Sequence, residues 1–176
     1  GWVRLRLEET WTASKETPQP ITLYVGLLKG DHLAEVVRVA TELGASQIVP
    51  ILTQHCVVRE LGENKLLRLR RIALEAAKQC ERSVIPEIKP VLPLRELPMV
   101  EQGFVAHPRV SQRLRDAYSP DKPTALLTGP EGGLSDAEIG MLEQRGFIPV
   151  TLGPRILRAE TAPMALLSLV TAAGGI

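Results

Sequence analysis

Residues 124–138 read TALLTGPEGGLSDAE, and this stretch decides the fold. Residues 124–127 form an apolar run of the length typical of a buried strand. A glycine loop at residues 129–133 ends that strand. Ser135 and Glu138 then have the spacing of a capping box, which opens a helix. A buried strand that leads through a glycine loop into a capped helix is typical of α/β domains.

Strands and helices continue to alternate on both sides of this loop. Apolar runs predict strands at residues 21–28, 47–52, 103–106, 124–127 and 147–152. Helical periodicity and capping residues predict helices at 31–44, 63–80, 110–118, 135–146 and 161–173. We therefore expect an α/β domain with a mainly parallel sheet flanked by helices. Ligands of such sheets bind outside the carboxyl ends of the strands.

Length and composition fit one globular domain. The chain has 176 residues, of which 44% are hydrophobic and 23% charged. It carries 21 Lys and Arg against 20 Asp and Glu, so its net charge is +1. This balance excludes a polybasic nucleic-acid-binding protein, and RNA binding would need a local cluster of positive charge. Only 3% of the residues are aromatic, which argues against modules that stack bases on aromatic side chains.

Neither a membrane span nor a metal site is expected. The richest apolar stretch, residues 162–173, is shorter than the about 20 residues that cross a bilayer. Charged residues interrupt the N-terminus, so we expect no signal peptide. We therefore expect a cytoplasmic location. The two cysteines lie far apart, which favours reduced thiols. The histidines, His32, His55 and His107, lack the spacing of metal ligands, and we interpret His32 and His55 as structural or surface residues.

The first twenty residues differ from the rest. Residues 2–8 alternate between apolar and polar, as in a half-buried strand, and residues 9–20 resemble a linker rich in Thr, Glu and Pro. The strand has no partner before the linker. We therefore expect residues 1–20 to be the last strand of a preceding domain with its linker, and residues 21–176 to be the main domain.

Two glycine loops are the first candidates for a binding site. The loop at 129–133 has neither the Gly-Lys-Ser/Thr ending of a phosphate-binding loop nor a G-x-G-x-x-G pattern, so phosphate and NAD binding lose support. A tight strand-to-helix turn would explain it equally well. The segment LGPRILRAETAP, residues 152–163, contains Arg155, Arg158 and Glu160. These charges form either a surface ion-pair cluster or a clamp for an anion or nucleobase.

The two segments together resemble the RsmE family. LLTGPEGGLSDAEI and LGPRILRAETAPMAL carry the resemblance, and KGDHLAEVVRVATELGASQIVPILTQHCVV, RRIALEAAKQCERSVIPEI and AHPR extend it from residue 21 to the end. Members of this family transfer a methyl group from S-adenosylmethionine to N3 of a uridine in 16S ribosomal RNA of the small subunit. The resemblance implies a SPOUT fold with a C-terminal trefoil knot and a homodimer packed partly through the last helix. It also implies an N-terminal PUA-like domain, of which residues 1–20 would be a remnant.

The resemblance also implies roles for individual residues. Arg158, or alternatively Arg155, would stabilise negative charge on the uracil. Glu131, Glu160 and His107 remain alternatives for a base, and Glu131 could instead cap a helix or orient a loop. The expected cofactor-binding residues are His107, Leu127, Thr128, Gly129, Gly132, Gly133, Leu152, Gly153, Ile156, Leu157 and Thr161.

Two other functions stay open. One is a SPOUT enzyme that methylates the ribose 2′-oxygen, and the other is a non-catalytic RNA-binding or assembly module. A row of basic residues follows one face of the helix predicted at residues 63–80 and continues just beyond it. It predicts either a solvated helix face or a surface that contacts RNA phosphates. Its members are Lys65, Arg68, Arg71, Lys78 and Arg82.

Overall fold

The sheet is parallel throughout. The computed structural model describes residues 2–4, 6 and 16–173. The strand order is β3-β2-β1-β6-β5-β7, and β4 also pairs with β2. The strands are β1 (Ile21–Gly26), β2 (Gln47–Leu52), β3 (Glu87–Ile88), β4 (Leu92–Pro93), β5 (Gly103–Ala106), β6 (Thr124–Thr128) and β7 (Phe147–Val150).

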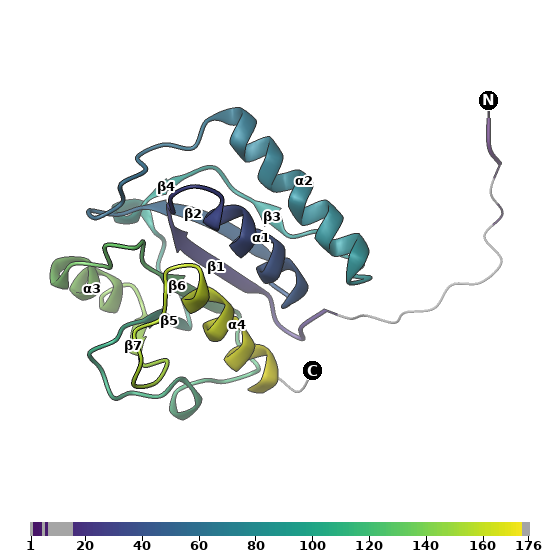
Figure 1. Ribbon diagram of the computed structural model, residues 1–176. Coiled ribbons are helices and arrows are strands. Elements are labelled where there is room, and N and C mark those ends of the chain that lie inside the picture. The colour runs from purple at the N-terminus through teal and green to yellow at the C-terminus, as the bar shows by residue number, and fades with distance from the viewer. Residues whose placement is uncertain (1, 5, 7–15, 174–176) are drawn as a thin grey trace.

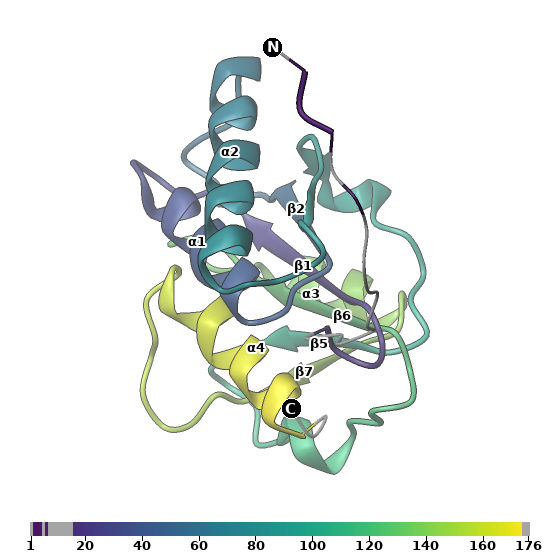
Figure 2. The same cartoon turned by 90° about the vertical axis from the view of Figure 1, so that its right-hand side faces the viewer.

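Helices cover both faces of this sheet. They are α1 (His32–Glu42), α2 (Glu63–Gln79), α3 (Asp136–Glu143) and α4 (Thr161–Ala173), with short 3-10 helices η1 (Leu94–Glu96) and η2 (Leu114–Asp116). Helices α1, α2 and α4 lie over one face, and α3 lies over the other (Figure 1, Figure 2). Neighbouring residues of β6 alternate between the two cores, because Leu126 packs towards the first face and Leu127 towards the second.

The expected parallel α/β architecture is confirmed, and all five predicted strands are present. The helix predicted at residues 110–118 is wrong, since only the three residues of η2 are helical. Here tertiary contacts override local propensity. The Gln112 carbonyl accepts a hydrogen bond from Thr151 N, and Arg113 forms a parallel bridge with Thr151. Of the strand expected at residues 2–8, residues 2–4 and 6 are described and form no strand, and the other three residues lie outside the described part of the chain.

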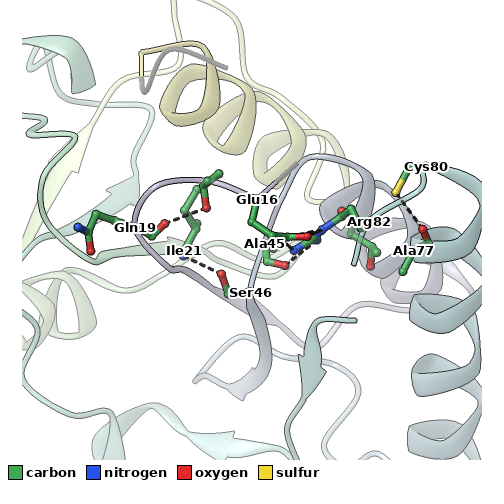
Figure 3. A network of polar contacts seen from close by, with 10 residues as sticks. Glu16, Gln19, Ile21, Ala45, Ser46, Ala77, Cys80 and Arg82 are labelled. Atoms are coloured by element: carbon green, nitrogen blue, oxygen red, sulfur yellow. Dashed lines mark hydrogen bonds and ion pairs between the residues drawn. The ribbon is translucent and has the colours of Figure 1, made fainter. Parts of the chain in front are cut away.

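Arg82 ties four segments together at the amino edge of the sheet. Its side chain is only 4% exposed. The guanidinium donates to both carboxylate oxygens of Glu16, which lies in the segment before β1. It also donates to the carbonyls of Thr41, at 2.7 Å, and Ala45, at 2.9 Å (Figure 3). We call Arg82 and these three partners the Arg82 anchor, and it joins residues 16–20 to the end of α1 and the start of β2.

None of the described helices combines the length and apolarity that crossing a bilayer requires. The described residues also contain no group of three or more His, Cys, Asp or Glu side chains placed to bind a metal ion. Cys56 and Cys80 are both free thiols.

Candidate functional site

Five connecting segments meet at the carboxyl edge of the sheet. Because all the strands run in the same direction, the segments that follow β1, β2, β5, β6 and β7 all leave the sheet at this edge. The two glycine loops are among them, since they follow β6 and β7. Strand β5 lies between these two strands, so the segment after it starts between the loops. This arrangement brings together the three segments in which the cofactor-binding residues were predicted.

The loop after β6 packs directly against the end of β1. A Cβ atom on Gly26 would lie 2.5 Å from Pro130 N and 2.9 Å from the carbonyl carbon of Gly129. These distances are too short for any side chain at position 26, where only the hydrogen atom of glycine fits. Gly133 N donates to the Pro130 carbonyl at 2.9 Å, and Gly133 takes a φ of +71°, which favours glycine. The predicted capping box is present, so Ser135 and Glu138 start α3 directly after the loop.

Gly26→Ala should destabilise the protein by about 1–3 kcal/mol, because its methyl group would push the loop away from β1. The obstructing atoms are backbone and proline ring atoms, which cannot rotate aside. Urea unfolding measures the effect. Gly140→Ala in α3 is the matched control, since the added methyl group would meet no other described part of the chain within 4 Å beyond its own helix backbone and adjacent residues, and alanine favours the helix. Equal stability of the two variants would contradict the close packing of β1 and the loop.

Two carboxylates connect the loops to one another. Glu131 Oε1 accepts a hydrogen bond from Lys29 N, in the turn after β1, at 2.9 Å. Glu138 Oε1 accepts one from Gln54 N, in the segment after β2, at 2.7 Å. The other oxygen of Glu138 accepts from Ser135 N. Through Glu131 and Glu138, the segments after β1, β2 and β6 are held as one unit.

His55 also lies at this edge, although its sequence context indicates a structural or surface residue. A Cβ atom on Gly132 would lie 2.7 Å from His55 Cβ and 3.1 Å from its carbonyl oxygen. The segment after β2 therefore covers one side of the glycine loop. Only glycine at position 132 permits this approach without a shift.

The loop after β7 is shaped by its own polar contacts. Gly153 N donates to Thr151 Oγ1 at 3.1 Å, and Gly153 has a φ of +106°. The Arg158 carbonyl accepts hydrogen bonds from Thr161 N and Ala162 N, so it begins the hydrogen bonding of α4. Ile156 is 88% exposed. Ile156 is one of the predicted cofactor-binding residues, and its apolar side chain is open to contact in this loop.

The segment after β5 runs beside this loop. His107 N donates to the Val150 carbonyl at 2.9 Å, which extends the pairing of β5 and β7. The His107 ring accepts a hydrogen bond from Arg109 N through Nδ1 at 3.2 Å. This hydrogen bond joins the His107 side chain to the backbone of the segment after β5.

Charged side chains of both signs lie at this edge. Arg155 and Arg158 are both exposed, and Arg158 lies 3.9 Å from Glu160. Asp31 is paired with Arg68 at 2.6 Å, and the hydrogen bond and charge of Arg68 lower the pKa of Asp31 below its usual value. Asp31 occupies the N-cap position of α1, but its carboxylate accepts from Arg68 and makes no capping hydrogen bond.

The predicted row of five basic side chains is wrong for Arg82, which is buried in its anchor. Helix α2 ends at Gln79, so Arg82 lies beyond its surface. Arg68 is engaged by Asp31, and Lys78 by Glu75 at 3.1 Å. Lys65 and Arg71 are exposed on α2. A row of five charges that all face solvent therefore does not form.

The predicted cofactor-binding residues lie in five places. His107 follows β5, and Leu127 and Thr128 are buried at the end of β6. Gly129, Gly132 and Gly133 form the loop after β6. Leu152, Gly153, Ile156 and Leu157 form the loop after β7, and Thr161 begins α4. We missed Lys29, His55 and Glu138 as contacts between loops, and also His32, which lies 3.7 Å from Glu160. Lys29 and His32 lie in the segment that follows β1 and begins α1. This position at the carboxyl end of a parallel strand could have marked both as site residues.

Comparison with known proteins agrees with this geometry. Residues 15–171 match the model of the RNA methyltransferase domain family. The chain is 39% identical to ribosomal RNA small subunit methyltransferase E of Synechocystis sp., over 95% of the chain and 58% of that protein. It is 35% identical to the Bacillus subtilis protein of the same name, over 92% of the chain and 69% of that protein. The chain thus spans between about half and two thirds of the length of these relatives.

A solved structure is similar over nearly the same region. The crystal structure of ribosomal RNA small subunit methyltransferase E from Neisseria gonorrhoeae, bound to S-adenosyl methionine, superposes with a TM-score of 0.83. It is 31% identical and covers 90% of this chain, while the chain covers 68% of it. The matched region contains the whole sheet and both glycine loops. The chain therefore belongs to the RNA methyltransferase domain family, among the relatives named ribosomal RNA small subunit methyltransferase E.

Proposed function

We propose that the chain is an S-adenosylmethionine-dependent methyltransferase that modifies N3 of a uridine in 16S ribosomal RNA. One observation carries the proposal: the segments after β5, β6 and β7 converge at the carboxyl edge of the sheet, and both glycine loops are among them. The names of its relatives and the cofactor in the Neisseria gonorrhoeae structure support the same activity.

The residues present fit this cofactor. Thr128 Oγ1 is buried and has no hydrogen-bond partner among the described residues, so it can bond to a ligand without losing another contact. A Cβ atom added to Gly133 or to Gly153 would meet nothing within 4 Å, which leaves open space beside the two loops. The backbone groups of Leu152, Gly153, Ile156 and Leu157 would hold the adenine. His107, Leu127, Thr128, Gly129, Gly132, Gly133 and Thr161 complete the proposed set.

The proposed reaction creates negative charge on the substrate. When bound, S-adenosylmethionine supplies the methyl group. Uracil N3 carries a proton that must leave before N3 can attack, and the resulting charge spreads onto the two neighbouring carbonyl oxygens. The exposed guanidinium of Arg158 is our proposed stabiliser of that charge, since a fixed cation beside a developing anion lowers the barrier. Arg155 is the alternative in the same loop.

Glu131 is our proposed second catalytic residue, and its hydrogen bond makes a sharp test possible. Glu131→Gln keeps an oxygen that can accept from Lys29 N, so the loop contact survives while the base is lost. If Glu131 takes the proton, kcat should fall by about 10²- to 10⁴-fold. Glu131→Ala removes the base and the contact together. Full activity in Glu131→Gln with reduced activity in Glu131→Ala would show that Glu131 only orients the loop.

We also propose the finer features that the family resemblance implies, namely a C-terminal trefoil knot and a homodimer. The dimer would pack partly through α4, and the exposed Leu169 on this helix supports that. Sedimentation at several protein concentrations tests the dimer. A monomer at every concentration would contradict it.

Calorimetric titration with S-adenosylmethionine is the first experiment. We expect saturable binding near one site per chain, and no binding of NAD or ATP under the same conditions. Unmodified 16S ribosomal RNA is then incubated with protein and cofactor, digested to nucleosides and analysed by mass spectrometry for N3-methyluridine. A 2′-O-methylated product would favour the ribose methyltransferase. Binding without transfer would favour the non-catalytic module, and absence of binding by the folded chain would overturn the proposal.

A further inference from the structure

One carboxylate at the carboxyl edge of the sheet lies between two basic side chains from distant parts of the chain. Glu160 Oε1 is 3.7 Å from His32 Nδ1 and 3.9 Å from Arg158 Nη1. His32 is the first residue of α1, and Arg158 lies in the loop before α4. Helices α1 and α4 lie side by side (Figure 1), and the carboxylate lies near the start of both.

Glu160 is more buried than either of its neighbours. Its side chain is 18% exposed, against 50% for His32 and 84% for Arg158. It lies near the starts of α1 and α4, and the positive end of a helix dipole favours a carboxylate there. A protonated His32 would add an opposite charge on the side of α1. Glu160 is thus the least exposed member of the group.

The Arg158 side chain is free to sample several rotamers unless a neighbouring group restrains it. Its backbone is fixed, because its carbonyl accepts the hydrogen bonds of Thr161 N and Ala162 N. Its guanidinium is largely in solvent, and an arginine side chain that becomes immobilised loses about 1.5–2 kcal/mol of rotamer freedom. Within the described part of the chain, Glu160 is the one acidic group within ion-pair distance of this guanidinium. We expect the Glu160 carboxylate to attract this guanidinium, and so to restrict the rotamers that it samples before the substrate arrives.

We propose that Glu160, held from the other side by His32, is a positioning residue that orients Arg158 for the transfer step. The inference rests on the proposed function, in which Arg158 contacts the developing charge on the substrate. It assigns His32 a role that its sequence context did not indicate. It also removes Glu160 from the candidates for the catalytic base, since a positioning carboxylate acts only through Arg158.

The test is a double-mutant cycle on kcat for methyl transfer to unmodified 16S ribosomal RNA. Glu160→Ala should lower kcat by about 10- to 100-fold, as expected when a catalytic group is misplaced. His32→Ala should lower kcat by a smaller factor. In the Arg158→Ala background, Glu160→Ala should cause no further loss, because its effect passes through Arg158. The residual rate is followed by prolonged incubation and mass spectrometry.

Glu75→Ala is the matched control, since it removes an exposed ion pair with Lys78, at 3.1 Å, in the last part of α2. Calorimetric Kd values for S-adenosylmethionine and thermal unfolding are measured for every variant, and both should stay near the wild-type values. A multiplicative loss in the double variant would overturn the inference and make Glu160 an independent catalytic group. Unchanged kcat in Glu160→Ala would overturn it too. Failure of the wild-type chain to bind the cofactor would instead overturn the proposed function.

Discussion

Arg158→Ala is expected to lower kcat for methyl transfer by about 10²- to 10³-fold, the loss seen when one group that stabilises a developing anion is removed. The Kd for S-adenosylmethionine should change by less than about twofold, because the proposed cofactor contacts in this loop are backbone groups. Single-turnover kinetics measure the transfer step, and calorimetry measures the Kd.

Arg155→Ala is the control for Arg158. The two arginines share one loop and are both exposed, so their removal changes the net charge equally. A uniform electrostatic effect on RNA binding would raise KM alike in both variants and leave kcat unchanged. Loss of kcat in Arg155→Ala alone would transfer the proposed role to Arg155.

Arg82→Ala is expected to destabilise the fold by about 3–5 kcal/mol, the cost of removing one partner of a buried ion pair. The substitution would leave the Glu16 carboxylate and the carbonyls of Thr41 and Ala45 without the donors that the anchor supplies. Urea unfolding followed by circular dichroism gives the free energy of unfolding. This loss is a large part of the about 5–15 kcal/mol by which ordinary domains are stable, so the unfolding midpoint should fall clearly.

Arg38→Ala is the comparison for this prediction. Arg38 also pairs with carboxylates, Glu35 and Glu42, but its side chain is 48% exposed. Removing it should cost at most about 1 kcal/mol, as for other surface pairs. A loss at Arg82 no larger than the loss at Arg38 would contradict the structural importance of the anchor.

Local sequence patterns predict the elements that have a strong periodic signal. The strand–loop–helix unit at residues 124–138 is formed with its capping box, because apolar run, glycine loop and cap all favour the same structure. The strands β3 and β4 have two residues each, too few for any periodicity to be seen. The helix expected at 110–118 is wrong because the segment pairs with the residues after β7 instead.

The site is predictable as far as its residues lie on recognisable loops. Rules for parallel sheets and the paired glycine segments are enough to place His107, Thr128 and Gly153 at one edge of the sheet. Contacts between loops cannot be predicted in this way. Glu131 and Glu138 bond to backbone groups at positions 29 and 54, and a backbone donor leaves no trace in the sequence. Arg82 continues the helical spacing of the exposed basic residues on α2, so the sequence pattern cannot reveal that its side chain is buried.

The hydrogen bonds of Glu131 and Glu138 have a thermodynamic consequence for ligand binding. They fix three loops during folding, so the conformational entropy of these loops is lost at that stage and not when a ligand arrives. A ligand that enters between such loops meets a surface already close to its bound shape. Its affinity then depends mainly on the contacts it makes, and its association is not slowed by ordering of the chain.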